Sequence, residues 1–148
     1  MSSREETVKA IVQEVLDLRS PKIQETRKDS ILDFIKMAVN GDDIKTHLVI
    51  DVKLNNTPGV YVYILTNARL IQIQIDVDHG ISSLAFVLSG IINVERKLID
   101  DARIEVQVIF KDNVVGLRYS TKDQKTTEFF QQIEQTWAKG GFNDKTTC

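Results

Sequence analysis

The spacing of apolar residues predicts two helices at the start of the chain. Two stripes of apolar side chains recur at intervals of three and four residues, the period of an amphipathic helix. They comprise Val8, Ile11, Val12, Val15 and Leu16, then Ile31, Phe34, Ile35 and Ala38. Ser20-Pro21 separates the stripes, because proline is poorly tolerated inside a helix, and Asn40-Gly41 is a typical helix stop. Residues 1–41 are therefore predicted to form an N-terminal helical pair.

Beyond Gly41 the apolar period changes from 3.6 to 2, which indicates half-buried β-strands. The clearest case runs from Arg69 to Val77, where isoleucines alternate with Gln72, Gln74 and Asp76. About seven strands are predicted, over 47–54, 60–65, 69–77, two segments joined around Ser89-Gly90, 103–110 and 115–119. Turn residues separate them, including "NNTPG", "TNAR", "DHG" and "KDN". Short strands at this spacing predict an antiparallel sheet.

Helical spacing returns near the end of the chain. Phe129, Phe130, Ile133 and Trp137 share one helix face, and Gly140-Gly141 ends the helix. Such a helix can cover one open end of a strongly bent sheet with its aromatic stripe. We expect an α+β fold, with residues 142–148 as a disordered tail.

Three segments carry a family resemblance. They are "VYVYILTNARLIQIQI" (residues 60–75), "SLAFVLSGIINVERK" (83–97) and "ARIEVQVIFKDNVVGLRYSTKDQKTTEFFQQIEQTW" (102–137). Together they resemble bacterial PH-like and GRAM-type domains of the pleckstrin-homology superfold, over about residues 44–140. The resemblance implies a strongly bent antiparallel sheet of about seven strands closed by a C-terminal helix, a PH-like β-barrel over residues 42–141. It also implies a binding scaffold for phosphoinositides, peptides or proteins, without catalysis.

Charge narrows the range of partners. The 19 basic and 21 acidic residues are interspersed along the chain, so nucleic-acid binding is not expected. Phosphoinositide binding is also disfavoured, because Lys53 is the one cation in the first hairpin and Asp51 lies beside it. No apolar run approaches the roughly 20 residues needed to cross a bilayer. The N-terminus lacks a secretory pattern and Cys148 is the single cysteine, so a cytoplasmic protein is predicted.

The sequence offers little catalytic chemistry. The two histidines are His47, which we interpret as solvated, and His79, which follows Asp76 and Asp78 in turn-forming surroundings. No glycine-rich phosphate loop and no nucleophile motif occurs. We expect no enzyme, no metal site and no cofactor.

Three residues define a candidate interaction surface: Tyr61, Tyr63 and Arg69. The tyrosines share one strand face, where they either form an exposed aromatic patch or lie beneath the N-terminal helices, which is the favoured interpretation. The remaining alternative is a homodimer, in which the helical stripes pair with a second subunit. Arg69 either faces a ligand or forms local salt bridges over the sheet, and the second interpretation is favoured.

The sequence therefore predicts a non-catalytic PH-like interaction module for protein binding or self-assembly. One alternative is a small-molecule-binding or catalytic protein on another curved α+β sheet, with a pocket formed by Tyr61, Tyr63, His47 or Arg69. A weak lipid-headgroup binder is the other.

Overall fold

The computed structural model describes residues 3–19, 27–54, 57–76 and 80–138. The chain divides into two compact units, Met1–Ala85 and Phe86–Cys148. None of the helices in the described ranges is long and apolar enough to cross a membrane.

The first unit consists of two helices and a four-stranded sheet. In chain order its elements are α1 (Ser3–Arg19), α2 (Lys28–Val39), β1 (Ile44–Leu54), β2 (Thr57–Thr66), β3 (Arg69–Asp76) and β4 (Ile81–Val87). The last two residues of β4 belong to the second unit. The strand order is β1-β2-β3-β4, and the β1–β2 and β2–β3 pairs are antiparallel. The sheet therefore has two edges, β1 and β4.

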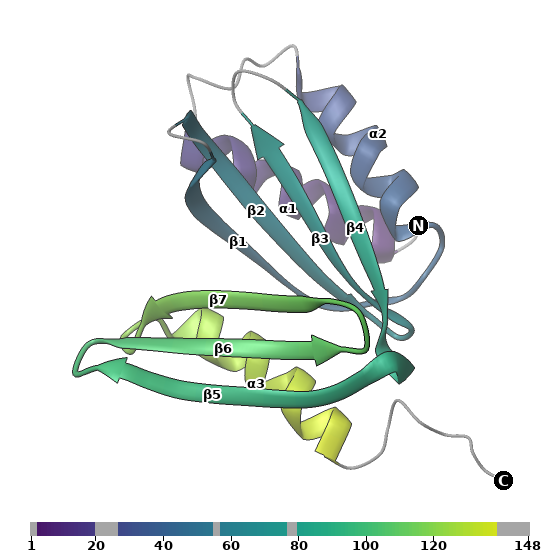
Figure 1. Ribbon diagram of the computed structural model, residues 1–148. Helices are drawn as coiled ribbons and strands as arrows, with labels where there is room; N and C mark the ends of the chain where they lie inside the picture. The colour runs from purple at the N-terminus through teal and green to yellow at the C-terminus, as the bar shows by residue number, and fades with distance from the viewer. Residues whose placement is uncertain (1–2, 20–26, 55–56, 77–79, 139–148) are drawn as a thin grey trace, which may run out of the picture. The chain divides into compact units, whose positions relative to one another are not determined.

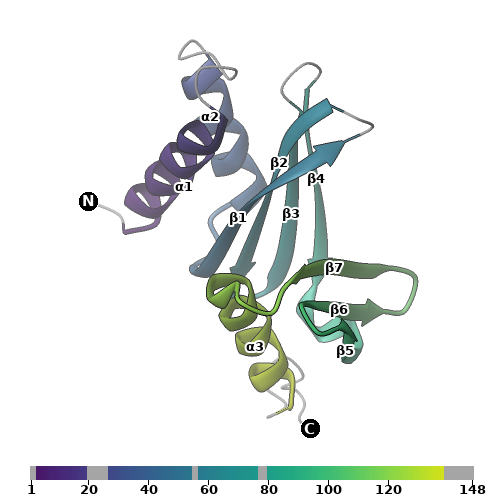
Figure 2. The same ribbon diagram turned by 90° about the vertical axis from the view of Figure 1, so that its left-hand side faces the viewer.

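Both helices pack on one face of this sheet, as Figure 1 and Figure 2 show. The predicted stripe of α1 is buried throughout, and α2 contributes Ile31, Ile35 and Val39. They pack against the valines and isoleucines of the central strands: Val60, Val62, Ile64, Ile71, Ile73 and Ile75. Burial of these branched apolar side chains is the main stabilising contribution in this unit.

This packing corrects the favoured interpretation of the tyrosines. Val62 and Ile64 face the helices, so Tyr61 and Tyr63 lie on the opposite face of β2, because successive side chains of a strand alternate. The helices therefore cover the valine face and not the tyrosine face. The α1 stripe is buried and so is not a surface for pairing with a second subunit, whereas Phe34 and Ala38 of the α2 stripe are only partly buried.

The end of α2 has the predicted stop. Asn40 adopts a left-handed conformation at φ 50° and Gly41 follows at φ 85°. The Asn40 amide donates to the Lys36 carbonyl at 3.1 Å, and the Asp42 amide donates to the Val39 carbonyl at 3.1 Å. These bonds satisfy carbonyls that a helix end leaves open, and the chain then turns into β1.

The second unit has a three-stranded antiparallel sheet and one helix. Its elements are the 3-10 turn η2 (Leu88–Gly90), β5 (Ile91–Asp100), β6 (Arg103–Phe110), β7 (Val114–Ser120) and α3 (Gln124–Ala138). The strand order is β5-β6-β7. The predicted "KDN" loop is closed by the Phe110 amide, which donates to the Asn113 carbonyl at 2.8 Å. At the start of α3, Asp123 accepts from the amide and the hydroxyl of Thr126 at 3.1 and 2.7 Å.

The aromatic stripe of α3 is largely confirmed. Phe129, Phe130 and Ile133 are buried, whereas Trp137 is only partly buried. Phe130 stacks on Tyr119 of β7 with ring centroids 6.5 Å apart, so contacts within the unit hold the helix.

The predicted α+β element order is confirmed: two helices, seven strands and a final helix within the described ranges. Two strands begin earlier than predicted: β1 begins at Ile44 and not at His47, and β2 begins at Thr57 and not at Val60. Pro58 pairs with Lys53 of β1, while the β2–β3 ladder starts one residue later at Gly59. Proline is tolerated near a strand start, where no second neighbour needs its missing N–H.

Several predicted features lie outside the described residues. They are the break at Ser20-Pro21, most of "DHG", the stop at Gly140-Gly141 and the tail 142–148. Closure of the two sheets into a barrel over 42–141 stays a prediction.

Candidate functional site

Arg69 lies at the start of β3, and its side chain binds residues at and just beyond the end of α2. Its Nε donates to Asp42 Oδ2 at 2.8 Å, and its Nη2 donates to the carbonyls of Ala38 and Val39 at 3.1 and 2.8 Å. The Arg69 and Asp42 side chains are 24% and 22% exposed. The cation also suits the negative end of the helix dipole. The interpretation of Arg69 as a locally bonded residue agrees with this geometry.

Thr66 holds the other side of the same turn and is fully buried. Its Oγ1 accepts from the amides of Ala68 and Arg69 at 3.1 and 2.8 Å. The same Oγ1 lies 3.0 Å from Asp42 Oδ2 and 3.2 Å from the Arg69 carbonyl oxygen, and its hydroxyl can donate to either acceptor. In the "TNAR" turn, the Thr66 hydroxyl therefore takes the place of a backbone carbonyl as the acceptor for two backbone amides.

A third contact joins the same two segments. The Asn67 amide donates to the Asp43 carbonyl at 3.1 Å. Thr66, Arg69 and Asp42 together tie the β2–β3 turn to the α2–β1 connection, and we call these three residues the Arg69 anchor. Sequence reasoning recognised the turn but missed Asp42, whose role depends on a partner 27 positions away.

Tyr63 is buried and not available as a contact surface. Its hydroxyl accepts from Gln72 Nε2 on β3 at 3.0 Å, and burial raises its pKa to about 12, against a smaller opposing effect of the Gln72 hydrogen bond. Tyr61 is partly exposed, and its ring lies edge-to-face on that of Tyr63 with centroids 5.9 Å apart. Only Tyr61 of this pair offers area to a partner.

The prediction that His47 is solvated is wrong. Its Nε2 lies 2.5 Å from Oε2 of Glu14 on α1, and its side chain is 25% exposed. His47 is opposite Ile64 in the β1–β2 ladder, which places it on the helix-covered face. The histidine therefore joins α1 to β1, which its position in the sequence pattern does not reveal.

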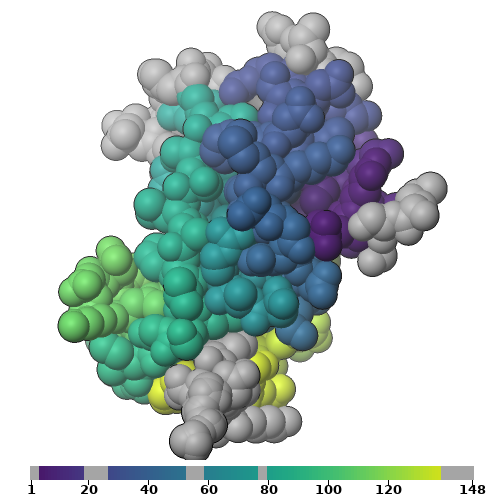
Figure 3. Space-filling model, turned by 90° about the vertical axis from the view of Figure 1, so that its right-hand side faces the viewer, coloured from purple at the N-terminus to yellow at the C-terminus, as the bar shows by residue number. Residues whose placement is uncertain are grey.

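Most of β4 is exposed, although Ile81 packs against the core beneath the helices, and a groove runs between α2 and β4. Figure 3 shows the face on which α2 and the outer strands of this sheet lie next to each other. The groove encloses about 250 Å³ and is lined by Phe34, Met37, Ala38, Asn40, Arg69, Ile71, Ser83 and Ala85. Met37 is 69% exposed, which is unusual for so large an apolar side chain. We call this the α2–β4 groove.

The strand along this groove is the most exposed of the four in its sheet. Residues 82–85 of β4 are all exposed, and Leu84 reaches 57%. β4 is an edge of its sheet, so within that sheet, as far as the structure describes it, one row of β4 backbone N–H and C=O groups faces no other strand. The groove therefore combines an apolar wall with an open hydrogen-bonding edge.

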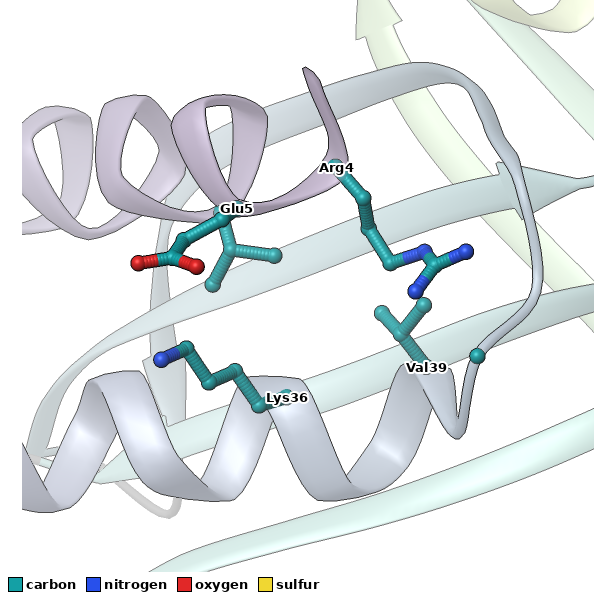
Figure 4. Close-up of a pocket in the computed structure, with 6 residues that line it drawn as sticks. Arg4, Glu5, Lys36 and Val39 are labelled. Atoms are coloured by element: carbon teal, nitrogen blue, oxygen red, sulfur yellow. The ribbon is translucent and has the colours of Figure 1, made fainter. Parts of the chain in front are cut away.

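A second groove of about 240 Å³ lies between the beginning of α1 and the end of α2, as Figure 4 shows. Carboxylates lie near both of its cations: the Glu5 side chain points toward Lys36, although Glu5 Oε2 also lies 3.6 Å from Lys9 Nζ, and Arg4 Nη2 lies 3.6 Å from Asp43 Oδ1. This balance gives little attraction for an anion. Among the described residues, no group of three His, Cys, Asp or Glu side chains could hold a metal ion.

Comparison with known proteins gives one structural likeness. No family model matches the chain, and no curated protein matches it. Among solved structures, the chain is similar to a DUF1696 family protein with a pleckstrin-homology domain from Shewanella loihica PV-4. The TM-score is 0.43 and the identity 14%, over 72% of this chain and 92% of that one. The predicted PH-like fold agrees with the four-plus-three antiparallel strands followed by a helix described above.

Proposed function

We propose that this chain is a non-catalytic PH-like interaction module that binds an extended protein segment in the α2–β4 groove. One observation carries the proposal: β4 is an exposed edge strand, and the groove along it has both apolar and polar side chains in its lining. An added strand gains main-chain hydrogen bonds from such an edge and side-chain contacts from such a groove.

The groove has the chemistry of a peptide site. Phe34 and Met37 provide an apolar wall, and the small side chains of Ser83 and Ala85 leave space at its floor. Every second side chain of a bound strand would point into this space, because side chains alternate along a strand. Met37 is flexible and polarisable, a property suited to contact with varied side chains.

The small-molecule alternative has less support. It needs Tyr61, Tyr63, His47 or Arg69 around one pocket, yet His47 and Tyr63 lie on opposite faces of the sheet. The Nε and Nη2 atoms of Arg69 already donate to Asp42 and to helix carbonyls, and Tyr63 is buried. The placement of these residues supports structural roles. Of the predicted interaction surface, Tyr61 is the residue that could still contact a partner.

Lipid-headgroup binding also has little support in the first unit. Headgroup phosphates need several cations that converge on one point. Arg4 and Lys36 border the same groove, but each faces a carboxylate. A protein segment is therefore the better-supported ligand, and a cytoplasmic location stays a prediction.

Selection from a random peptide library displayed on phage tests the proposal. Peptides that enrich on the full chain are measured against Ala85→Glu, which places a charge in the groove, and against Val114→Lys, an exposed change in the other unit. We expect binding that Ala85→Glu weakens at least about tenfold, or 1.4 kcal/mol, and that Val114→Lys leaves unchanged. Failure to enrich any peptide, or equal binding to both variants, would contradict the proposal.

A further inference from the structure

We infer that the segment in the α2–β4 groove is β4 of a second copy of this chain, paired antiparallel across a two-fold axis. This inference rests on the proposed function and names the partner of the same site.

Charged residues mark every edge strand except β4. The strands at the sheet edges are β1, β4, β5 and β7. β1 carries Lys45 and Asp51 within its span, β5 carries the run Glu95-Arg96-Lys97, and β7 carries Arg118. Charges on an edge strand oppose unwanted pairing with other strands. β4, "ISSLAFV", has no charged residue, no proline and no glycine, so nothing in it opposes pairing.

The absence of charge favours an identical partner over a different one. The uncharged run extends beyond β4, from Gly80 to Val94. A strand that recognised a distinct partner by charge would present at least one ionised side chain for selectivity. An uncharged edge meets its own copy without any like-charge contact. A second copy is also present wherever the chain is present.

Two-fold pairing brings apolar surface together on both faces of the strand. Ser83 and Ala85 line the groove, so Leu84 points to the opposite face of the sheet. An axis near the middle of β4 places the two Leu84 side chains against each other and covers surface that is 57% exposed in one copy. On the groove face, the small Ser83 and Ala85 of one copy lie beside those of the other, within reach of the exposed Met37.

Symmetry also restricts the register. Opposite residues of an antiparallel pair point to the same face, so a two-fold axis perpendicular to the sheet must pass where a residue faces its own copy. A residue one position away from the axis is offset from its own copy by about 7 Å along the strand, which is twice the rise per residue, and every further position adds the same offset. Single cysteines therefore report the register sharply.

A cysteine scan of β4 tests the pairing. Ser82, Ser83, Leu84, Ala85 and Phe86 are replaced singly by cysteine in a Cys148→Ser background, with Val114→Cys as the control. We expect the oxidised dimer to peak at one β4 position, most simply Leu84→Cys, because directly opposite strand residues have a Cα separation that a disulfide accepts. Equal yields along β4, or no yield above the Val114→Cys control, would overturn the inference.

Sedimentation velocity of the full chain provides the second measurement. We expect reversible dimerisation at micromolar concentrations, the range of interfaces of modest size. Leu84→Lys should weaken it at least about tenfold, because two ammonium groups would meet at the axis, whereas Val114→Lys should not. Circular dichroism shows whether each variant retains its fold.

The outcomes separate this inference from the proposed function. A chain that stays monomeric up to about 0.5 mM, yet binds library peptides in an Ala85→Glu-sensitive way, overturns self-pairing and leaves the groove as a peptide site. A monomer with no peptide binding contradicts both. A dimer that Leu84→Lys leaves intact overturns pairing through β4.

Discussion

At the scale of single residues, the Arg69 anchor shows how one turn determines the placement of a helix. Arg69 donates to two helix carbonyls and to Asp42, and Thr66 uses one hydroxyl to hold the turn. Hydrogen bonds between charged groups are stronger than hydrogen bonds between neutral groups. Removal of one charged partner therefore lowers the stability of the protein by more. The turn therefore contributes to stability well beyond its own residues.

Arg69→Ala should lower the free energy of unfolding by about 2–3 kcal/mol, because it leaves Asp42 and two carbonyls without their donor. Urea denaturation followed by circular dichroism measures the change. The control is Arg103→Ala, since Arg103 donates to Asp100 at 2.9 Å in an exposed pair. That loss should stay below about 1 kcal/mol. Equal losses for the two variants would show that the Arg69 anchor stabilises the fold no more than an exposed ion pair does.

Tyr63 should make stability fall at alkaline pH. Its pKa is raised from 10.0 to about 12 by burial, so the unfolded chain releases the phenol proton at lower pH than the folded chain. The stabilising contribution is complete below about pH 10 and is lost as the pH rises toward 12, up to about 3 kcal/mol. Urea denaturation at pH 9 and pH 11.5 measures the loss in the wild-type chain.

Tyr63→Phe separates this effect from general alkaline unfolding. The variant should retain more of its stability between these two pH values, although it loses about 1 kcal/mol at neutral pH because Gln72 loses its acceptor. Tyr61→Phe should keep the alkaline loss. An unchanged alkaline loss in Tyr63→Phe would mean that Tyr63 is not the group responsible.

At the scale of elements, apolar periodicity predicted most of the first unit. The stripe from Val8 to Leu16 and the alternation of Ile71, Ile73 and Ile75 correspond to buried faces. What the pattern could not decide was which face of β2 receives the helices. Val62 and Tyr63 are both fully buried, so alternation alone gives two equivalent faces.

The two faces of α2 should respond differently to the same kind of change. Ile35 is fully buried against the sheet, whereas Met37, two residues later, is 69% exposed. Ile35→Ala should cost about 2–5 kcal/mol and Met37→Ala less than about 0.5 kcal/mol. Thermal or urea unfolding measures both. A larger loss for Met37→Ala than for Ile35→Ala would contradict the packing of α2 on the sheet.

The same pair of variants also tests the groove. Met37→Ala removes part of the apolar wall without disturbing the core, so peptide binding or self-association should weaken while stability is kept. Surface plasmon resonance with an enriched peptide, or sedimentation, measures this effect. Unchanged binding would place the ligand away from the α2–β4 groove.

At the scale of the whole molecule, the sequence predicted the α+β class and the element order, but it could not identify the site. Turn chemistry and alternation are local signals, and they located the seven strands. An exposed edge depends on the strand order, which brings β4 to the outside of its sheet. The sequence predicted two strands joined around Ser89-Gly90. The lack of charge from Gly80 to Val94 became informative only when the strand order showed that β4 is an edge.

The function proposed for the whole molecule requires that β4 gain a strand neighbour when a partner binds. Amide hydrogen exchange by mass spectrometry measures this directly, because a new strand protects the edge amides whatever its identity. The chain is compared at about 2 μM and about 200 μM, and again at low concentration with an enriched peptide. We predict that exchange within Ile81–Val87 slows in at least one of these conditions, while exchange in β1, β5 and β7 does not change. Exchange of β4 that is independent of both concentration and peptide, or slowing confined to another edge, would contradict the account.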